Sequence, residues 1–188
     1  LLVPADSESH SVDRIRKQDT PLVIIDRCVS ASEVDVVRGD SEGGAFLLTE
    51  HLIKLGHRRI TLLSGPEKVS TSVDRVRGYE RAMKEHGLSD DIHYYYGEYS
   101  QESGAAITRD IFSGDLTPPT AIFGGNNVIT IGALSVLRSL GLRVPDDVAM
   151  VSFDDIPASL TFIPFMTVVS QPPYEMGEKA TELLLQQI

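Results

Sequence analysis

One stretch of the chain, Pro119–Asp155, constrains the fold more than any other. Two short apolar runs within it each lead into a polar pair, Asn126-Asn127 after the first and Asp154-Asp155 after the second. The segment between them has helical apolar spacing and ends at Gly141, which is typical of a helix closed by a glycine. Strand, helix and strand in this order predict a βαβ unit with parallel strands. Both polar pairs then lie at carboxyl ends of strands, where open α/β sheets bind ligands.

The rest of the chain repeats this architecture with different sequences. Strands that alternate with helices throughout predict an α/β fold with parallel, doubly wound sheets. Asp40 is expected to cap the helix that follows it rather than to contact a ligand. The other expected strands are Pro21–Asp26, Ile60–Leu63, His93–Tyr96 and Thr167–Val169, with Leu1–Val3 as the tail of a further strand. The other expected helices are Val12–Gln18, Glu42–Leu55, Asp74–His86, Gln101–Phe112 and a last one from about Pro173.

Composition excludes several classes of protein. The net charge of -10 argues against nucleic-acid binding by this chain itself, because phosphate contacts need clustered Lys and Arg. There is no apolar run of about 18 residues, so no membrane span is expected. The single cysteine, Cys28, excludes an internal disulfide and suits a reducing compartment.

The common catalytic motifs are missing from the sequence. It contains no GxxxxGK[ST] phosphate loop, no GxSxG elbow and no HExxH zinc motif. The glycines of residues 40–44 lack the GxGxxG spacing, and the five histidines lack ligand spacing. We therefore expect no metal, no cofactor and no enzymatic activity. An acid–base enzyme that uses Asp154 or Asp155 would need a second titratable partner, and the sequence offers no obvious one.

Polar residues at strand ends, and in the loops after them, are the candidates for ligand contact. Each also has an ordinary structural explanation, such as a surface arginine or a partly buried tyrosine. Asn127 and Asp155 are better placed as helix or loop caps than as ligand contacts. The candidate ligand-binding residues are Thr71, Arg75, Tyr99, Asn126, Asp154 and Gln171.

The chain resembles the effector-binding core of the lactose-repressor (LacI/GalR) family of bacterial transcription regulators. Six segments in the family's order carry the resemblance. They are PLVIIDR, GDSEGGAFLLTEHLIKLGHRRITLLSGP, DRVRGYERAMKEHG, PTAIFGGNN, GLRVPDDVAMVSFDD and TVVSQPPYEMGEKATELL. The family's ligand-contacting positions fall on the six candidates above. The chain departs from the family at Asn127, where an aspartate is usual.

The resemblance implies a two-lobed fold like that of periplasmic sugar-binding proteins. Residues 1–56 would be the remainder of the N-terminal lobe, residues 57–168 the C-terminal lobe, and residues 169–188 a return into the first lobe. The core would be truncated at both ends, and the helix-turn-helix headpiece would be absent from this chain.

The resemblance also implies a function. The expected effector is a small molecule, most often a sugar or sugar derivative, although the family includes purine-responsive and phosphoprotein-responsive members. The protein would act in the cytoplasm as a homodimer that binds operator DNA through the headpiece, with no membrane partner. The alternative with the same fold is a periplasmic or transporter-associated sugar-binding receptor.

Overall fold

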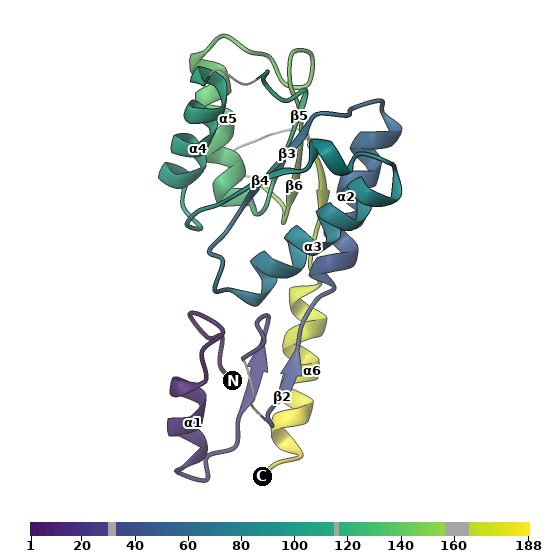
Figure 1. Ribbon diagram of the computed structural model, residues 1–188. Helices are drawn as coiled ribbons and strands as arrows, with labels where there is room; N and C mark the ends of the chain where they lie inside the picture. Colours follow the sequence, from purple (N-terminus) through teal and green to yellow (C-terminus); the bar gives the residue numbers. More distant parts are fainter. Residues whose placement is uncertain (30–32, 115–116, 157–165) are drawn as a thin grey trace.

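The computed structural model describes residues 1–29, 33–114, 117–156 and 166–188, which form a larger and a smaller unit joined at a narrow waist (Figure 1). The larger unit contains a parallel sheet whose described strands run in the order β4-β3-β5-β6-β7. These strands are β4 (His93–Tyr96), β3 (Ile60–Ser64), β5 (Ala121–Gly124), β6 (Ala149–Phe153) and β7 (Thr167–Val169). The order places β3 in the interior with later strands on both sides, as a doubly wound fold requires.

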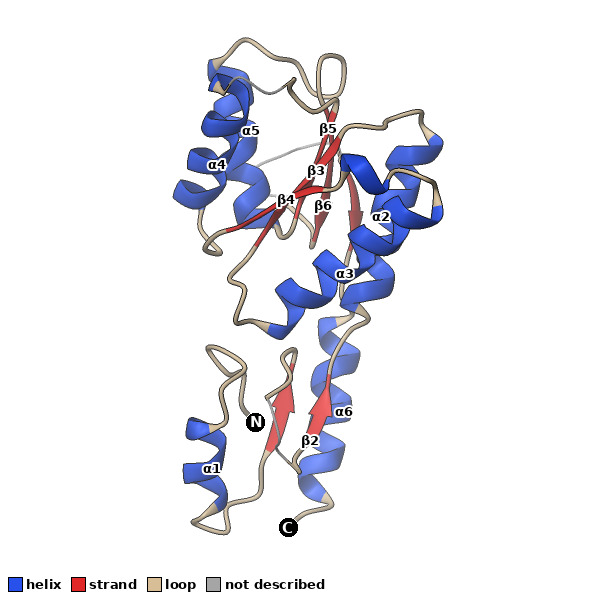
Figure 2. Ribbon diagram, in the orientation of Figure 1, coloured by secondary structure: helices blue, strands red, loops and turns tan. Residues whose placement is uncertain are grey.

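Helices cover both faces of this sheet (Figure 2). On one face α2 (Ser41–Lys54) and α3 (Ser70–Glu85) pack over a core that includes Leu48, Leu62 and Phe123. On the other face α4 (Gln101–Ser113) and α5 (Asn127–Ser139) enclose a second core. A 3-10 turn, η1 (Ser89–Asp91), connects α3 to β4. The expected α/β fold with parallel, doubly wound strands is confirmed.

The helix ends follow the local signals in the sequence. Gly56, Gly87 and Gly141 follow α2, α3 and α5 with φ angles of 96°, 72° and 74°, the left-handed region that glycine adopts without strain. The side chain of Asp40 accepts a hydrogen bond from the amide of Gly43 and caps α2, as expected.

The smaller unit is built around a short parallel pair, β1 (Val23–Ile25) and β2 (Asp35–Val37). Leu2 forms a parallel bridge with Ile24, in agreement with a strand tail at the start of the chain. The helices α1 (His10–Arg16) and α6 (Pro173–Leu185) flank the pair (Figure 1). The sequence analysis missed β2, whose two valines, Val36 and Val37, lie between the charged residues Asp35 and Arg38 and so do not stand out as an apolar run.

Two boundaries differ from the expectation. α3 begins at Ser70 rather than at Asp74, so Thr71 lies in the first turn of the helix rather than in the loop before it. The domain division also differs, because the expected first lobe, residues 1–56, includes α2. In the structure the α2 residues Ala45 and Leu52 are buried in the core of the larger unit. The chain crosses the waist at residues 38–40, before α2, and packing therefore assigns α2 to the larger unit.

The crossing of α2 and α3 depends on a glycine. A Cβ atom on Gly78 of α3 would lie 2.1 Å from the carbonyl oxygen of Glu42 in α2. We therefore expect Gly78→Ala to force the helices apart and to lower the free energy of unfolding by about 3 kcal/mol. Gly177→Ala on α6 is the matched control, since nothing lies within 4 Å of its added Cβ. It should raise stability by roughly 0.5–1 kcal/mol. Urea unfolding measures both, and equal effects would contradict the close approach.

Candidate functional site

The six predicted residues all lie at the waist end of the larger unit. Thr71 and Arg75 are one turn apart on the first two turns of α3. The other four follow the carboxyl ends of parallel strands. Tyr99 follows β4, Asn126 follows β5, Asp154 follows β6 and Gln171 follows β7. The parallel sheet brings together residues that are up to 100 positions apart in the sequence.

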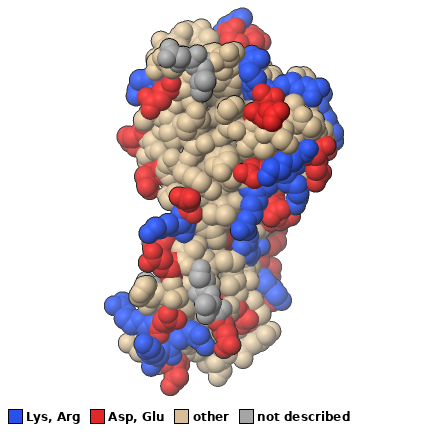
Figure 3. Space-filling view, viewed as in Figure 1, with Lys and Arg blue, Asp and Glu red and all other residues tan. Residues whose placement is uncertain are grey.

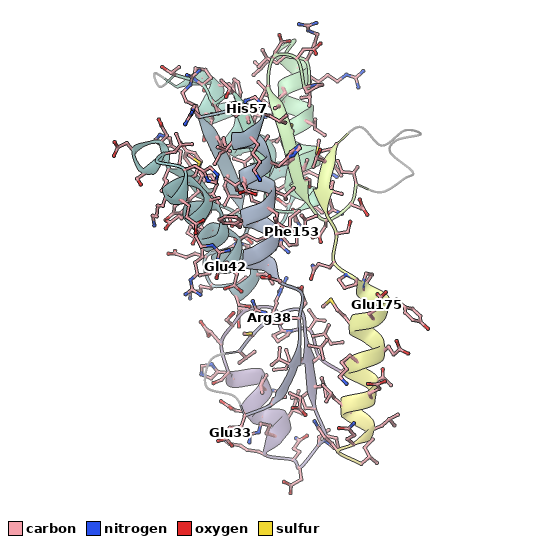
Figure 4. The ribbon with its side chains drawn as sticks, turned by 90° about the vertical axis from the view of Figure 1, so that its right-hand side faces the viewer. Glu33, Arg38, Glu42, His57, Phe153 and Glu175 are labelled. Atoms are coloured by element: carbon pink, nitrogen blue, oxygen red, sulfur yellow. The ribbon has the colours of Figure 1, made fainter. Side chains whose placement is uncertain are left out.

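Arg75 is the centre of this group and is 3% exposed. Its Nη1 donates to the carbonyl oxygen of Gly125 at 2.5 Å, and its Nη2 lies 3.9 Å from Oδ2 of Asp154. The guanidinium carbon lies 3.8 Å from the centre of the ring of Phe153, a core residue of the larger unit that Figure 4 labels. Its Nε is buried and has no hydrogen-bond partner among the described residues. Arg75 therefore keeps one donor that a ligand could satisfy.

Asp154 and Gln171 form a second linked pair. Asp154 has a φ of 64°, a left-handed conformation that is uncommon for residues other than glycine. Its Oδ1 accepts a hydrogen bond from Nε2 of Gln171 at 3.3 Å. The Oε1 atom of Gln171 is buried without a partner in the described part of the chain. Strain and an unsatisfied acceptor at one place are typical of a binding site.

Tyr99 is half-buried, and its hydroxyl is fixed by α3. The hydroxyl oxygen lies 3.2 Å from Oγ1 of Thr71 and 2.8 Å from Oγ of Ser72. The ring packs against Gly65, where a Cβ would lie 2.3 Å from two ring atoms. These contacts hold the aromatic ring in one orientation, so that it could stack on an apolar face of a ligand.

The structure corrects the roles of the two asparagines. Asn126, expected to contact a ligand, caps α5, because its Oδ1 accepts from the amide of Ile129 at 2.9 Å. Asn127, expected to be the cap, instead donates from Nδ2 to the carbonyl oxygen of Asp155 at 2.8 Å. The residue before the first helical turn provides the cap, and α5 begins at Asn127. The cap uses only the oxygen of Asn126, which leaves its amide nitrogen at the edge of the site.

The sequence analysis missed an Asp-Arg pair in the smaller unit. Asp26 ends β1 with a φ of 72°, as Asp154 ends β6. The adjacent Arg27 donates to the carbonyl oxygens of Pro4 and Ala5, and its guanidinium carbon lies 5.9 Å from the centre of the Tyr99 ring. The Nε atom of Arg27 is also buried with no hydrogen-bond partner among the described residues, and it lies 3.7 Å from Oδ2 of Asp26. The same strand-end signal, PLVIID, could have identified this pair.

Charge in the site is balanced. Two guanidinium groups, Arg27 and Arg75, lie near two carboxylates, Asp26 and Asp154, at 3.7 Å and 3.9 Å respectively. Within the described ranges, no group of three or more His, Cys, Asp or Glu side chains could hold a metal ion. The site therefore has two donors without a hydrogen-bond partner among the described residues, Nε of Arg27 and Nε of Arg75, and one such acceptor, Oε1 of Gln171. Its two positive and two negative side chains balance each other. This chemistry suits an uncharged, hydroxyl-rich ligand.

The chain is similar to known proteins over its whole length. Residues 49–188 match the family described as periplasmic binding protein-like domains. The HTH-type transcriptional repressor PurR of Photobacterium profundum is 31% identical over all of this chain, which spans 57% of that repressor's length.

Two solved structures share the fold. The CelR–cellobiose complex, a transcriptional regulator, has a TM-score of 0.87 and 31% identity over 99% of this chain and 57% of its own. A LacI family transcriptional regulator from Enterococcus faecium with bound ribose has a TM-score of 0.82 and 26% identity over 96% of this chain and 69% of its own. The ligands of these two complexes, cellobiose and ribose, are sugars. In the described part of this chain, no helix has the length and apolar character needed to cross a membrane.

The cap assignment at α5 can be tested by stability. Asn126→Ala removes the acceptor for the amide of Ile129 and should lower the free energy of unfolding by about 1 kcal/mol. Asn126→Asp keeps a capping oxygen and should cost only a small part of that. Urea unfolding of both variants beside Asn127→Ala checks the assignment. A larger loss for Asn127→Ala than for Asn126→Ala would show that Asn126 is not the main cap.

Proposed function

We propose that this chain is the effector-binding core of a bacterial transcription regulator. The chain belongs to the periplasmic binding protein-like domain family, and it is similar to repressors and other regulators of the LacI family. The observation that carries the proposal is the pair of unsatisfied buried groups at the waist, Nε of Arg75 and Oε1 of Gln171. A ligand that accepts from the first and donates to the second would satisfy both.

We propose a sugar or sugar derivative as the effector. Adjacent hydroxyls can each donate and accept, which matches the mixture of guanidinium, amide and carboxylate groups around Asp154. The half-buried ring of Tyr99 offers a flat surface for the apolar face of a sugar ring. The balanced charge of the site favours a neutral ligand over a phosphorylated one. The ribose and cellobiose complexes of the similar regulators support this choice.

Six residues of the larger unit would bind the effector, with two more from the smaller unit. Arg75, Asp154 and Gln171 would hydrogen-bond it directly. Thr71 would act mainly by fixing Tyr99, and Asn126 would contribute only its amide nitrogen. Asp26 and Arg27 would contact the same ligand from across the waist. A ligand that touches both units stabilises the arrangement in which they approach each other.

The regulatory output would come from the rest of the protein. Binding can shift the equilibrium between open and closed arrangements only by the difference in effector affinity between them. In a homodimer, closure would change the spacing of two helix-turn-helix headpieces, and so operator affinity. The net charge of -10 argues against DNA contact by this chain, although Figure 3 shows Lys and Arg side chains in a band at the right of the larger unit, with Asp and Glu beside them. DNA contact would therefore be made by the headpiece. The similar repressors are transcriptional regulators, and we propose that this protein likewise acts in the cytoplasm.

The relatives are regulators rather than enzymes, and the site supports binding without turnover. The carboxylate of Asp154 accepts a hydrogen bond from Gln171 and lies 3.9 Å from Nη2 of Arg75. Asp155 accepts a hydrogen bond from Ser170. Neither is placed as a free general acid.

A thermal-shift screen tests the proposed effector class. D-Ribose, D-glucose, D-galactose, cellobiose, glucose 6-phosphate and hypoxanthine form a suitable panel. We expect at least one neutral sugar to raise the Tm, and Asp154→Ala or Arg75→Ala to weaken its binding by at least about tenfold, measured by calorimetry. Arg143→Ala, on the opposite edge of the sheet, is the control.

Two outcomes would contradict the proposal. A Tm shift by hypoxanthine alone would replace the sugar with a nucleobase. Equal affinity of a sugar for the unmodified chain and for Arg75→Ala would remove Arg75 from the site.

A further inference from the structure

Beside the effector site, a separate set of contacts joins the two units. Arg38, the residue after β2, lies at the waist in Figure 4. Its Nη2 donates to Oδ2 of Asp74 on α3, and its Nη1 contacts the sulfur of Cys28, the residue that follows Arg27. Burial lowers the pKa of the Arg38 guanidinium, because it disfavours the charged form. The contacts with Cys28 and Asp74 raise the pKa by more, so the net shift is upward. The carboxylate of Asp74 is 11% exposed and also lies 3.4 Å from Nη1 of Arg77.

Hydroxyl groups extend these contacts to the first turn of α3. The residue before that turn is Val69, which has no polar side chain to cap the helix. Instead, Ser7 of the smaller unit accepts from the amide of Ser70 at 3.0 Å. The hydroxyl of Ser70 accepts in return from the amide of Cys28 at 2.8 Å. Free amides in a first helical turn need such partners, and here the other unit supplies one.

The same helix carries the effector-facing side chains. Asp74 and Arg75 are neighbours on α3, and Ser70 precedes Thr71. A movement of the smaller unit away from α3 would therefore break the contacts of Asp74 and Ser70, and would also move Arg27 relative to Tyr99. The contacts with the effector and the contacts between the units are coupled through one rigid element.

We propose that Arg38 and Asp74, with Ser7 and Ser70, form an inter-unit clasp that positions α3 for effector binding. Arg38 and Asp74 are positioning residues, since they act through α3 and the smaller unit rather than on the ligand. The clasp favours the arrangement in which both units face the effector, and its loss reduces the fraction of chains ready to bind. The effector part of this inference rests on the proposed function, whereas the clasp itself does not.

Hydrogen–deuterium exchange of the chain without ligand tests the clasp. We expect Arg38→Met and Asp74→Asn each to speed exchange of the amides of residues 70–76 by roughly tenfold. The double variant should be no faster than either single variant, because both remove the same interaction. Arg38→Lys keeps the charge and should restore part of the protection. Arg143→Met breaks the exposed pair with Asp147 at the other edge of the sheet and should leave residues 70–76 unchanged.

A merely structural role would give a different pattern. If the variants speed amide exchange in α5 by the same factor as in residues 70–76, the whole larger unit is destabilised and the proposal is overturned. Unchanged exchange in residues 70–76, or fully additive effects in the double variant, would also overturn it. If Arg38→Met does not fold, as judged by circular dichroism, Asp74→Asn alone decides the result. Because no ligand is used, failure of every sugar to bind would contradict the proposed function without affecting this result.

Discussion

The buried guanidinium of Arg75 holds α3 against the sheet of the larger unit. A charge that is almost fully removed from water is costly unless hydrogen bonds and an opposite charge compensate it. The carbonyl of Gly125, the carboxylate of Asp154 and the face of Phe153 provide that compensation. These partners belong to the ends of β5 and β6, so the need to pair one charge fixes α3 against the sheet. The Nε atom left over is then a donor of well-defined position.

Both units have an aspartate with a left-handed backbone directly after a strand. Asp26 and Asp154 each end a strand in a left-handed conformation, which turns the chain sharply at the carboxyl edge. Such strain persists only where the surroundings hold it in place, and here each amide donates to a neighbouring strand, to Val37 and Val169 respectively. The repetition gives each unit an aspartate at the carboxyl end of a strand. A ligand can therefore bridge the units only if it satisfies groups of both.

α3 carries two of the proposed effector-binding residues and also contacts the smaller unit. One side of its first two turns carries Thr71 and Arg75, while Ser70 and Asp74 contact the smaller unit. Close packing on α2 through Gly78 makes α3 a rigid part of the larger unit. A small displacement at either set of contacts is therefore transmitted as a movement of the whole helix. This is the property that a ligand-controlled switch between two arrangements requires.

The sequence by itself determined most of the elements, the parallel direction of the strands and the edge of the sheet at which the candidate binding residues gather. These follow from local signals, such as apolar runs that end in polar residues and glycines after helices. Only the tertiary structure decided that Asn126 rather than Asn127 caps α5, that α2 packs with the larger unit, and that Arg27 and Arg38 reach across the waist. The packing of α2 and the contacts of Arg27 and Arg38 depend on side chains far apart in the sequence, about which a local pattern carries no information. The cap of α5 is local, but two adjacent asparagines give the same signal, so the sequence does not choose between them.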